Sequence, residues 1–483
     1  MSAHNTTDNH EGQKAIFENI EIIEENPREA RKLLRKIDTC LLPVMAVSYM
    51  FQFLDKSALA YTSILGLNES LHLDGFQFSW SNSIYYIGYL IASYPFGLLM
   101  VRFPVGTVIA ISVAIWGIIL MLTAVCHDHS GLWANRFFLG VSEAAVAPGL
   151  AVVISMWYTR SEQPLRQAAW FLGNTFAGIF GGLVSYGIGH IKTIAPWKAV
   201  FLFFGAATIA WSIFIYLLLP DDPTKARFLS ASERERALER VRSNMTGRKN
   251  TKINWRQCRE ALGDVQAWLL VLIQLSGQIA NGGVQGFGSI VIHGMGFETL
   301  KTLQIQMVAY VFQLIFVLLA TIGSTYLHNT RTLWVVFNMA FSITGAAMVG
   351  QLDGKWSRFF GYCLTMGYTP NFPIILSMLS ANTAGFTKKM TVNAMLFIAY
   401  CAGNIIGPQL FFEREYPTYP TGFLAIMICY AIGLSGSLVL RAYLVWENAR
   451  RDRIPQSSGM NARELDNVDD QTDKQLSRFR YIY

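Results

Sequence analysis

The sequence predicts an all-α membrane protein that crosses the bilayer twelve times in two six-helix bundles, the major facilitator architecture. Three observations support this prediction. The 483 residues are 52% hydrophobic and only 15% charged, against about 25% charge in soluble domains. Apolar runs of the length that spans a bilayer, about 20 residues, recur twelve times. One long polar segment, residues 220–263, divides these runs into six and six.

Each apolar run is expected to be helical, because lipid offers no hydrogen-bond partner to an open backbone. The predicted spans cover residues 39–64, 78–100, 106–126, 132–157, 167–190, 198–219, 265–292, 303–326, 333–350, 357–380, 391–412 and 420–446. They form an amino-terminal bundle at 38–219 and a carboxy-terminal bundle at 264–446, which differ in length by one residue. Equal halves are typical of transporters whose bundles rock about a central site. Residues 1–37 and 447–483 are expected to be mobile polar tails in the cytosol.

The distribution of Lys and Arg predicts the orientation. With both termini in the cytosol, 31 of the 39 basic residues lie on the inner side, 6 lie outside and two lie within spans. This asymmetry is typical of multi-pass membrane proteins. The first apolar run begins only at Cys40, so no cleavable signal peptide is predicted. The net charge of +7 therefore reflects contact with the lipid bilayer, and no nucleic-acid partner is expected.

Four ionisable residues stand out within the spans, and all lie in the amino-terminal half: Asp55, Lys56, Arg136 and Glu143. Each costs about 2.5–3.5 kcal/mol at mid-membrane and therefore requires a polar interior. Arg136 and Glu143 are seven residues apart, so they share one face of a helix. If a substrate carboxylate joined these two positive and two negative charges, protonation of Asp55 or Glu143 would restore neutrality. The alternative role is a set of ion pairs that only fastens helices together.

The carboxy-terminal spans contain no matching charge, but they carry polar side chains. These are Gln278, Asn281 and Gln285 at helical spacing in the seventh span, Tyr368 and Asn371 in the tenth, and Asn404 in the eleventh. Lys56 and Arg136 are expected to attract an anion. The opposite wall of the site is assigned to four polar residues: Gln285, Asn281, Tyr368 and Asn404. Interhelical hydrogen bonds are the alternative role for each of them.

Several stretches together carry a family resemblance. They are FLDKSALAY at 53–61, SWSNSIYYIGYLIASYP at 79–95, LWANRFFLGVSEAAVAPG at 132–149, WYTRSEQPLRQAAWF at 157–171, LPDDPTKARFLSASER at 219–234 and GNIIGPQLF at 403–411. From Asp38 to Trp446 the chain resembles the major facilitator superfamily, and within it the fungal allantoate permease branch of the anion:cation symporters. The resemblance implies that Glu143 takes part in proton coupling.

The resemblance also implies gating residues near the inner ends of the second and fourth spans. The family pattern G-x-L-x-D-R-x-G-R falls on GLLMVRFPVG at 97–106, which retains Gly97 and Arg102 but has Val101 in place of the acid. Glu162 and Arg166, in the loop after the fourth span, are therefore assigned as a substitute inner-gate ion pair. Solvated surface charge is the alternative there.

Weaker motifs add little. The six Cys include no CxxC pair, and His127 and His129 have no further ligands nearby, so no metal site is predicted. No catalytic residue or enzyme motif is assigned, and no cofactor is expected besides a proton gradient. Asn68 begins an Asn-Glu-Ser glycosylation sequon on the predicted outer side.

The sequence thus predicts a monomeric secondary transporter of a small organic anion, coupled to protons. The resemblance implies a carboxylate such as allantoate, nicotinate or a related vitamin or nitrogen-source acid, and a place in the plasma membrane. GIFGG at 178–182 lacks the proline of drug antiporters, which favours uptake. The alternatives are a proton-coupled exporter of an acidic fungal metabolite and a nutrient receptor that binds without transporting.

Overall fold

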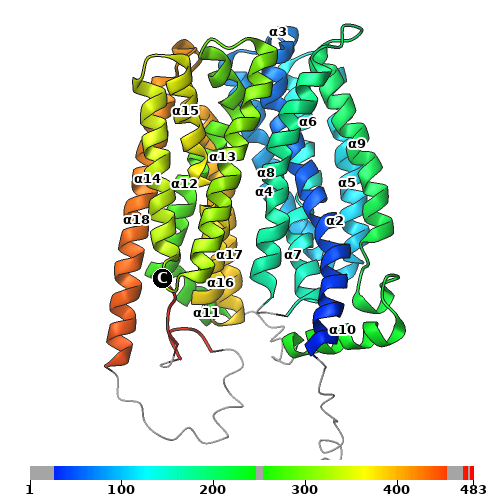
Figure 1. The fold of residues 1–483 in the computed structure, drawn as a ribbon, viewed down its shortest axis with the longest axis vertical. Coiled ribbons are helices and arrows are strands. Elements are labelled where there is room, and N and C mark those ends of the chain that lie inside the picture. Colours follow the sequence, from blue (N-terminus) through cyan, green and yellow to red (C-terminus); the bar gives the residue numbers. More distant parts are fainter. Residues whose placement is uncertain (1–26, 160–161, 246–253, 454–470, 477–478) are drawn as a thin grey trace, which may run out of the picture.

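The computed structural model describes residues 27–159, 162–245, 254–453, 471–476 and 479–483. Most of the predicted amino-terminal tail and of the carboxy-terminal tail lies outside these residues. Every regular element in the described chain is a helix. Figure 1 shows two bundles side by side, with the first half of the chain in one and the second half in the other.

The amino-terminal bundle follows the predicted order of spans. Its elements are α2 (Pro27–Thr62), the π-helical η1 (Ser63–Leu67), α3 (Asn68–Ser70), α4 (Gly75–Arg102), α5 (Val105–Leu122), η2 (Thr123–Val125), α6 (His129–Glu143), α7 (Val146–Trp157), α8 (Gln163–Ile188) and α9 (Pro196–Leu218). Helix α2 begins within the predicted tail, so residues 27–37 are helical where mobile chain was expected.

A linker and the carboxy-terminal bundle follow. The linker contains η3 (Pro223–Lys225), α10 (Ala231–Met245) and α11 (Trp255–Leu262). The bundle contains α12 (Val265–Gly294), α13 (Thr299–Tyr326), α14 (Arg331–Gln351), α15 (Lys355–Thr365), η4 (Met366–Tyr368), α16 (Asn371–Asn382), α17 (Phe386–Ile406), η5 (Gly407–Leu410), η6 (Glu413–Glu415) and α18 (Pro420–Asp452).

Asp side chains cap the start of three α-helices in the described chain, α4, α6 and α12. Helix α4 starts after a capping box in which the Asp74 carboxylate accepts a hydrogen bond from the Gln77 amide at 2.7 Å. Asp128 and Asp264 cap α6 and α12 in the same manner. Such carboxylates satisfy free amides and complement the positive end of the helix dipole.

The predicted tenth span is broken. In the described residues, eleven helices are long and apolar enough to cross a membrane, and the span predicted at 357–380 is divided into α15, η4 and α16. Proline explains the break, because Pro370 and Pro373 lack the amide hydrogen that a continuous helix needs. The break lies at the level of the central cavity and turns Tyr368 toward it.

The two ends of the molecule differ. Helices α10 and α11 and the C-terminus lie at one end, which we call the linker end, and α3 lies at the other, which we call the distal end (Figure 1). At the linker end α10 is fastened to the amino-terminal bundle by Lys36–Glu233 and Arg236–Glu29, both at 2.6 Å. The hydrogen bond from Lys36 holds the pKa of the Glu233 carboxyl below its usual range.

Candidate functional site

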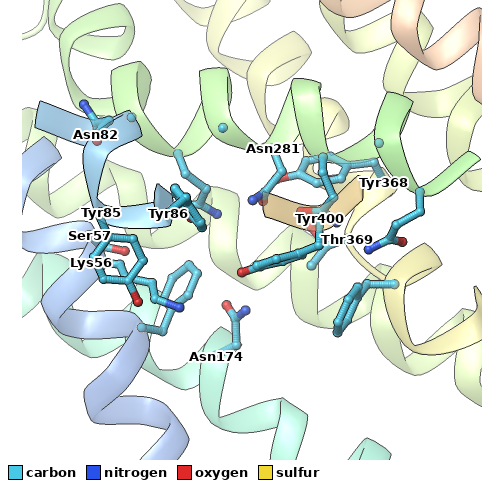
Figure 2. A pocket seen from close by; sticks show the side chains of 18 of the residues that line it. Lys56, Ser57, Asn82, Tyr85, Tyr86, Asn174, Asn281, Tyr368, Thr369 and Tyr400 are labelled. Atoms are coloured by element: carbon cyan, nitrogen blue, oxygen red, sulfur yellow. The ribbon is translucent and has the colours of Figure 1, made fainter. Parts of the chain in front are cut away.

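A cavity lies between the two bundles. Figure 2 shows Lys56 and Asn174 from one bundle pointing into the space that Asn281 and Tyr400 border from the other. Polar residues of the amino-terminal bundle line it: Gln52, Lys56, Ser57, Ser81, Asn82, Arg136 and Asn174. Polar residues of the carboxy-terminal bundle face them: Gln274, Gln278, Asn281, Gln285, Thr369 and Asn371. Aromatic rings complete the wall: Tyr49, Phe53, Tyr85, Tyr86, Phe171, Tyr368, Phe372 and Tyr400.

The charged side chains that line the cavity in the described residues are all positive. Among the described residues, Lys56 and Arg136 are the charged side chains of the cavity wall, and no carboxylate lines it. Arg136 is only 3% exposed, and its Nε and Nη2 atoms have no hydrogen-bond partner in the described chain. A buried guanidinium with free donors is costly unless an anion accepts from it. The cavity wall therefore offers unused guanidinium donors to an acceptor.

Glu143 lies directly behind this wall. It is fully buried, and its Oε2 atom accepts a 2.6 Å hydrogen bond from the hydroxyl of Tyr85. Lys56 Nζ lies 4.0 Å from the same oxygen, while Glu143 Oε1 has no partner in the described residues. Glu143 therefore does not line the cavity, but it is in contact with Lys56, which does.

Close packing of α4 against α6 produces this contact. A Cβ atom on Gly140 would collide with the carbonyl oxygen of Tyr85, and one on Gly88 would collide with that of Phe137. Only residues without a side chain allow the two backbones to approach so closely. The same approach brings the Tyr85 ring beside Glu143, one turn after Gly140.

Aromatic rings orient the Lys56 ammonium. Its Nζ atom lies 5.3 Å from the ring centroids of both Tyr85 and Tyr89, within the range of a cation–π contact. The two rings favour the charged amine without neutralising it. Lys56 therefore remains available to an anion that enters the cavity.

Asp55 is not brought to the cavity, contrary to the sequence-based expectation. Its Oδ2 atom accepts hydrogen bonds from Trp116 Nε1 and, at 3.2 Å, from the hydroxyl of Thr208. Those partners belong to α5 and α9, on the side of α2 turned away from the carboxy-terminal bundle. Adjacent helical residues point about 100° apart. Lys56 therefore faces the cavity while Asp55 faces α5 and α9.

The opposite wall is organised by a chain of hydrogen bonds. Tyr368 donates to Asn281 Oδ1 at 2.6 Å, and Asn281 Nδ2 donates to Asn404 Oδ1 at 2.8 Å. Asn404 in turn donates to Gln278 Oε1 at 3.0 Å. Asn404 is fully buried and does not line the cavity. It was expected to touch substrate, but its place is behind Asn281, whose amide it orients.

Two other predicted residues lie at the cavity with partners of their own. Gln285 Oε1 accepts a hydrogen bond from Tyr310 at 3.3 Å. Asn371 Oδ1 accepts one from Asn338 at 2.9 Å. Both amide groups are thus anchored by a neighbouring helix.

Some lining residues were missed by the sequence analysis. Gln52 precedes Lys56 by one helical turn, and Gln274 precedes Gln278 by the same interval. Residues at this spacing share one face of a helix, so both could have been predicted from the sequence. Asn82 lies in the polar run SWSNS at 79–83 and Asn174 precedes Thr175, so local polarity was a signal for both. For the aromatic residues the sequence offers no such signal, because rings are equally common in the lipid-facing surface and in the core.

The bundles are joined by hydrogen bonds at the distal end. Ser79 donates to the Pro408 carbonyl at 3.1 Å, Ser83 donates to the Ile405 carbonyl at 2.7 Å, and the Gly75 amide donates to Glu413 at 2.7 Å. Nearer the middle, Gln313 donates to Thr175 at 3.1 Å. These contacts between the bundles lie at the distal end and in the middle of the molecule. The structure is therefore closed on the distal side.

The predicted gating residues have other partners than expected. Arg166 pairs with Asp38 at 2.8 Å and Glu162 pairs with Arg240 at 2.7 Å, so the expected Glu162–Arg166 pair is not formed. Each residue has a nearer partner of opposite charge on α2 or α10. Arg102 ends α4 exposed and without an ion pair in the described chain, and Gly97 has open space where a Cβ would lie.

The predicted glycosylation site lies at the distal end, at the start of α3. Asn68 is half-buried, and its Oδ1 atom is buried without a partner in the described residues. The hydroxyl of Ser70, the third sequon residue, accepts a 3.0 Å hydrogen bond from Trp197.

The helical fold and the cavity between the bundles define a multi-pass membrane transporter. The sequence profile of the Major Facilitator Superfamily matches residues 45–408. The chain is 32% identical to the allantoate permease of Saccharomyces cerevisiae, over 96% of this chain and 89% of that protein. It is 36% identical to an uncharacterized transporter of Schizosaccharomyces pombe, over 94% of this chain and 86% of that one. The chain therefore belongs to the major facilitator superfamily, as its motifs predicted.

Solved structures agree on the fold. The xylose transporter XylE from E. coli, in a partially occluded inward open conformation, superposes with a TM-score of 0.61 at 13% identity, over 88% of this chain and 99% of XylE. A bacterial homolog of the human lysosomal transporter Spinster, inward-facing and occupied, gives 0.60 at 15% identity, over 84% of this chain and 94% of that one. These proteins share the two-bundle architecture with the present chain.

Proposed function

We propose that the protein is a proton-coupled importer of a small organic anion that carries a carboxylate. One observation carries the proposal: the charged side chains that line the cavity in the described residues, Lys56 and Arg136, are both cations. The similarity to an allantoate permease supports a carboxylate of that kind, such as allantoate, nicotinate or a related nitrogen-source acid.

Competition for Lys56 supplies the coupling. In the substrate-free cavity Lys56 balances Glu143, 4.0 Å away. A substrate carboxylate that binds Lys56 and Arg136 removes that balance and leaves the Glu143 charge buried without compensation, which is costly in a low-dielectric interior. Uptake of a proton by Glu143 removes the cost. Anion and proton therefore bind together.

The carboxy-terminal wall recognises the neutral part of the substrate. The chain from Tyr368 through Asn281 to Asn404 fixes the Asn281 amide, and Gln278 and Gln285 add further donors and acceptors from α12. A ligand with amide or ring-nitrogen groups opposite its carboxylate satisfies both walls. Specificity among carboxylates then depends on these neutral side chains.

Alternating access follows from the distribution of contacts between the bundles. We assign the linker end to the cytosol, with both termini there, because the basic residues concentrate at that end. The distal hydrogen bonds of Ser79 and Ser83 then close the outer side. Import requires these bonds to break and the cytosolic ends to meet. We place the protein in the plasma membrane as a monomer.

Uptake into proteoliposomes tests the proposal. Each carboxylate is paired with its neutral amide, for example nicotinate with nicotinamide, under an imposed gradient with acid outside. The acid is expected to accumulate and the amide is not, and Arg136→Gln is expected to abolish the difference. Equal transport of acid and amide would refute anion recognition. Thermal stabilisation without uptake would indicate a receptor, and net movement only out of the vesicle in exchange for protons would indicate an exporter.

A further inference from the structure

The C-terminal segment, of which residues 471–476 and 479–483 are described, is docked against the carboxy-terminal bundle at the linker end, where a mobile tail was expected. Two side-chain amides bind its backbone. Asn448 of α18 accepts from the Tyr481 amide at 2.9 Å and donates to the Tyr481 carbonyl at 2.8 Å. Asn382 of α16 does the same with Ile482, at 2.8 and 2.7 Å. Such paired bonds recognise a peptide backbone and order it.

The segment also completes a buried charge cluster. Lys388 at the start of α17 is 1% exposed and contacts Asp473 at 2.7 Å, Asp264 at 2.8 Å and Glu260 at 3.1 Å. Asp473 is equally buried and also accepts a 2.8 Å hydrogen bond from the hydroxyl of Tyr481. The cluster joins α11, α12 and α17, and the segment supplies its third carboxylate.

Arg451 of α18 is enclosed by the same segment. Its Nη1 donates to the backbone carbonyls of Asp473 at 2.9 Å and Phe479 at 3.1 Å. Its Nη2 donates to the Tyr481 hydroxyl at 2.8 Å, and the Tyr481 ring lies over the guanidinium at 4.5 Å. Most hydrogen bonds of this buried arginine therefore depend on docking.

The amino-terminal bundle has a counterpart of this arrangement. There Asp38, at the start of the first membrane span, pairs with Arg166 of α8 at 2.8 Å, and α10 joins the same loop through Arg240–Glu162 at 2.7 Å. In the second half Asp264, at the start of α12, pairs with Lys388 of α17. The two pairs occupy equivalent places in their halves, with α10 fastening one loop and the C-terminal segment the other.

We propose that the C-terminal segment is an intramolecular ligand of a peptide-binding groove formed by Asn382, Lys388, Asn448 and Arg451. Its docking fastens the α16–α17 loop to α11, α12 and α18. Helix α17 extends from Lys388 to Ile405, whose carbonyl takes part in the distal contacts. Docking therefore makes the carboxy-terminal bundle move as one body when the bundles rock, a consequence that rests on the proposed alternating access.

Hydrogen–deuterium exchange on the full-length protein in nanodiscs tests docking without any substrate. The amides of Tyr481 and Ile482 are expected to exchange at least about tenfold more slowly than in the free peptide. Asn448→Leu should release Tyr481, and Tyr481→Ala, which alters only the segment, should also speed exchange at Ala384, whose amide donates to Asp473. Asp452→Asn is the control, because it breaks only an exposed pair with Arg480.

Exchange at the free-peptide rate in the wild type, or no response to either variant, would overturn the docking. The mechanical role has its own measurement. Tyr481→Ala is expected to lower substrate turnover by about fivefold or more while the Kd of the anion stays unchanged, since closure and not the site is affected. Release of the segment with unchanged turnover would overturn that role and leave the proposed transport function intact.

Discussion

Lys56 Nζ lies 4.0 Å from Glu143 Oε2, at the boundary between the central cavity and the interior of the amino-terminal bundle. The separation is at the limit of an ion pair, and the amine also lies over the rings of Tyr85 and Tyr89. Lys56 is thus held in place but not saturated. Among the described residues it is the cation that both lines the cavity and pairs with the buried acid, which makes it the connection between anion and proton.

Removing the Lys56 charge is expected to weaken anion binding. A charge-assisted hydrogen bond contributes about 1.5–3 kcal/mol, so Lys56→Gln should raise the Kd of the transported carboxylate by about 10- to 100-fold. Binding is measured by ligand-dependent thermal stabilisation. Asn82→Ala, on the same wall but uncharged, is the control and should change the Kd much less. Unchanged affinity in Lys56→Gln would exclude this residue from the anion site.

Asp55 is expected to stabilise the fold and not to carry the transported proton. Asp55→Asn should keep acid-driven accumulation, because the carboxylate faces Trp116 and Thr208 and not the cavity. Trp116→Phe should destabilise the protein by about 1.5–3 kcal/mol, since it removes a hydrogen bond to a buried charge. The first is measured as uptake against pH and the second as thermal unfolding. Loss of accumulation in a well-folded Asp55→Asn protein would show that Asp55 takes part in proton coupling.

The distal hydrogen bonds are expected to set the resting conformation. Ser79→Ala with Ser83→Ala removes three bonds between the bundles, because the Ser83 hydroxyl also accepts from Gln409 at 2.9 Å; each is worth about 0.5–1.5 kcal/mol. The double variant should shift the equilibrium about tenfold toward the state open at the distal end. Spin-label distances across that end measure the shift. Ser93→Ala is the control, because its hydroxyl bonds only to Tyr89 of its own helix; an equal shift there would contradict the assignment.

Close packing of α4 and α6 is expected to be indispensable. Gly140→Val places a branched side chain against the Tyr85 carbonyl, and overpacking of this kind costs about 1–3 kcal/mol or more. The variant should lower the unfolding temperature and separate Tyr85 from Glu143. Gly97→Ala, with open space at its Cβ position, is the matched control and should be neutral. Equal thermal stability of the two variants would show that the helices can separate without cost.

The sequence contained enough information for the architecture and for part of the site. Span lengths follow from bilayer thickness, and the cost of a membrane charge singles out Lys56, Arg136 and Glu143. Which way a side chain points depends on packing between helices. Asp55 differs from Lys56 by one position and yet faces α5 and α9, because the rotation of α2 is set by its packing, such as the close approach of Gly173 to the Ala46 carbonyl, which composition does not reveal.

Hydrogen-bond partners that are far apart along the chain could not be predicted from the sequence either. Asn404 was assigned to substrate because amide donors opposite the two cations suit a polar anion, but its partner is Asn281, 123 residues away. The polar composition of the C-terminal segment predicted mobility, whereas Arg451 and Lys388 bind it through groups that the sequence alone does not pair. The tenth span was predicted from hydropathy as one continuous helix, whereas Pro370 and Pro373 accompany its division into α15, η4 and α16.

The most direct measurement of the central claim is anion flux in proteoliposomes containing Glu143→Gln, with and without a pH gradient. The neutral amide copies the protonated acid in shape and charge but cannot release a proton. We predict that the variant exchanges anion across the membrane at a rate near that of the wild type, yet does not accumulate it when the outside is acidified. Gradient-driven accumulation that matches the wild type would contradict the claim that Glu143 carries the proton.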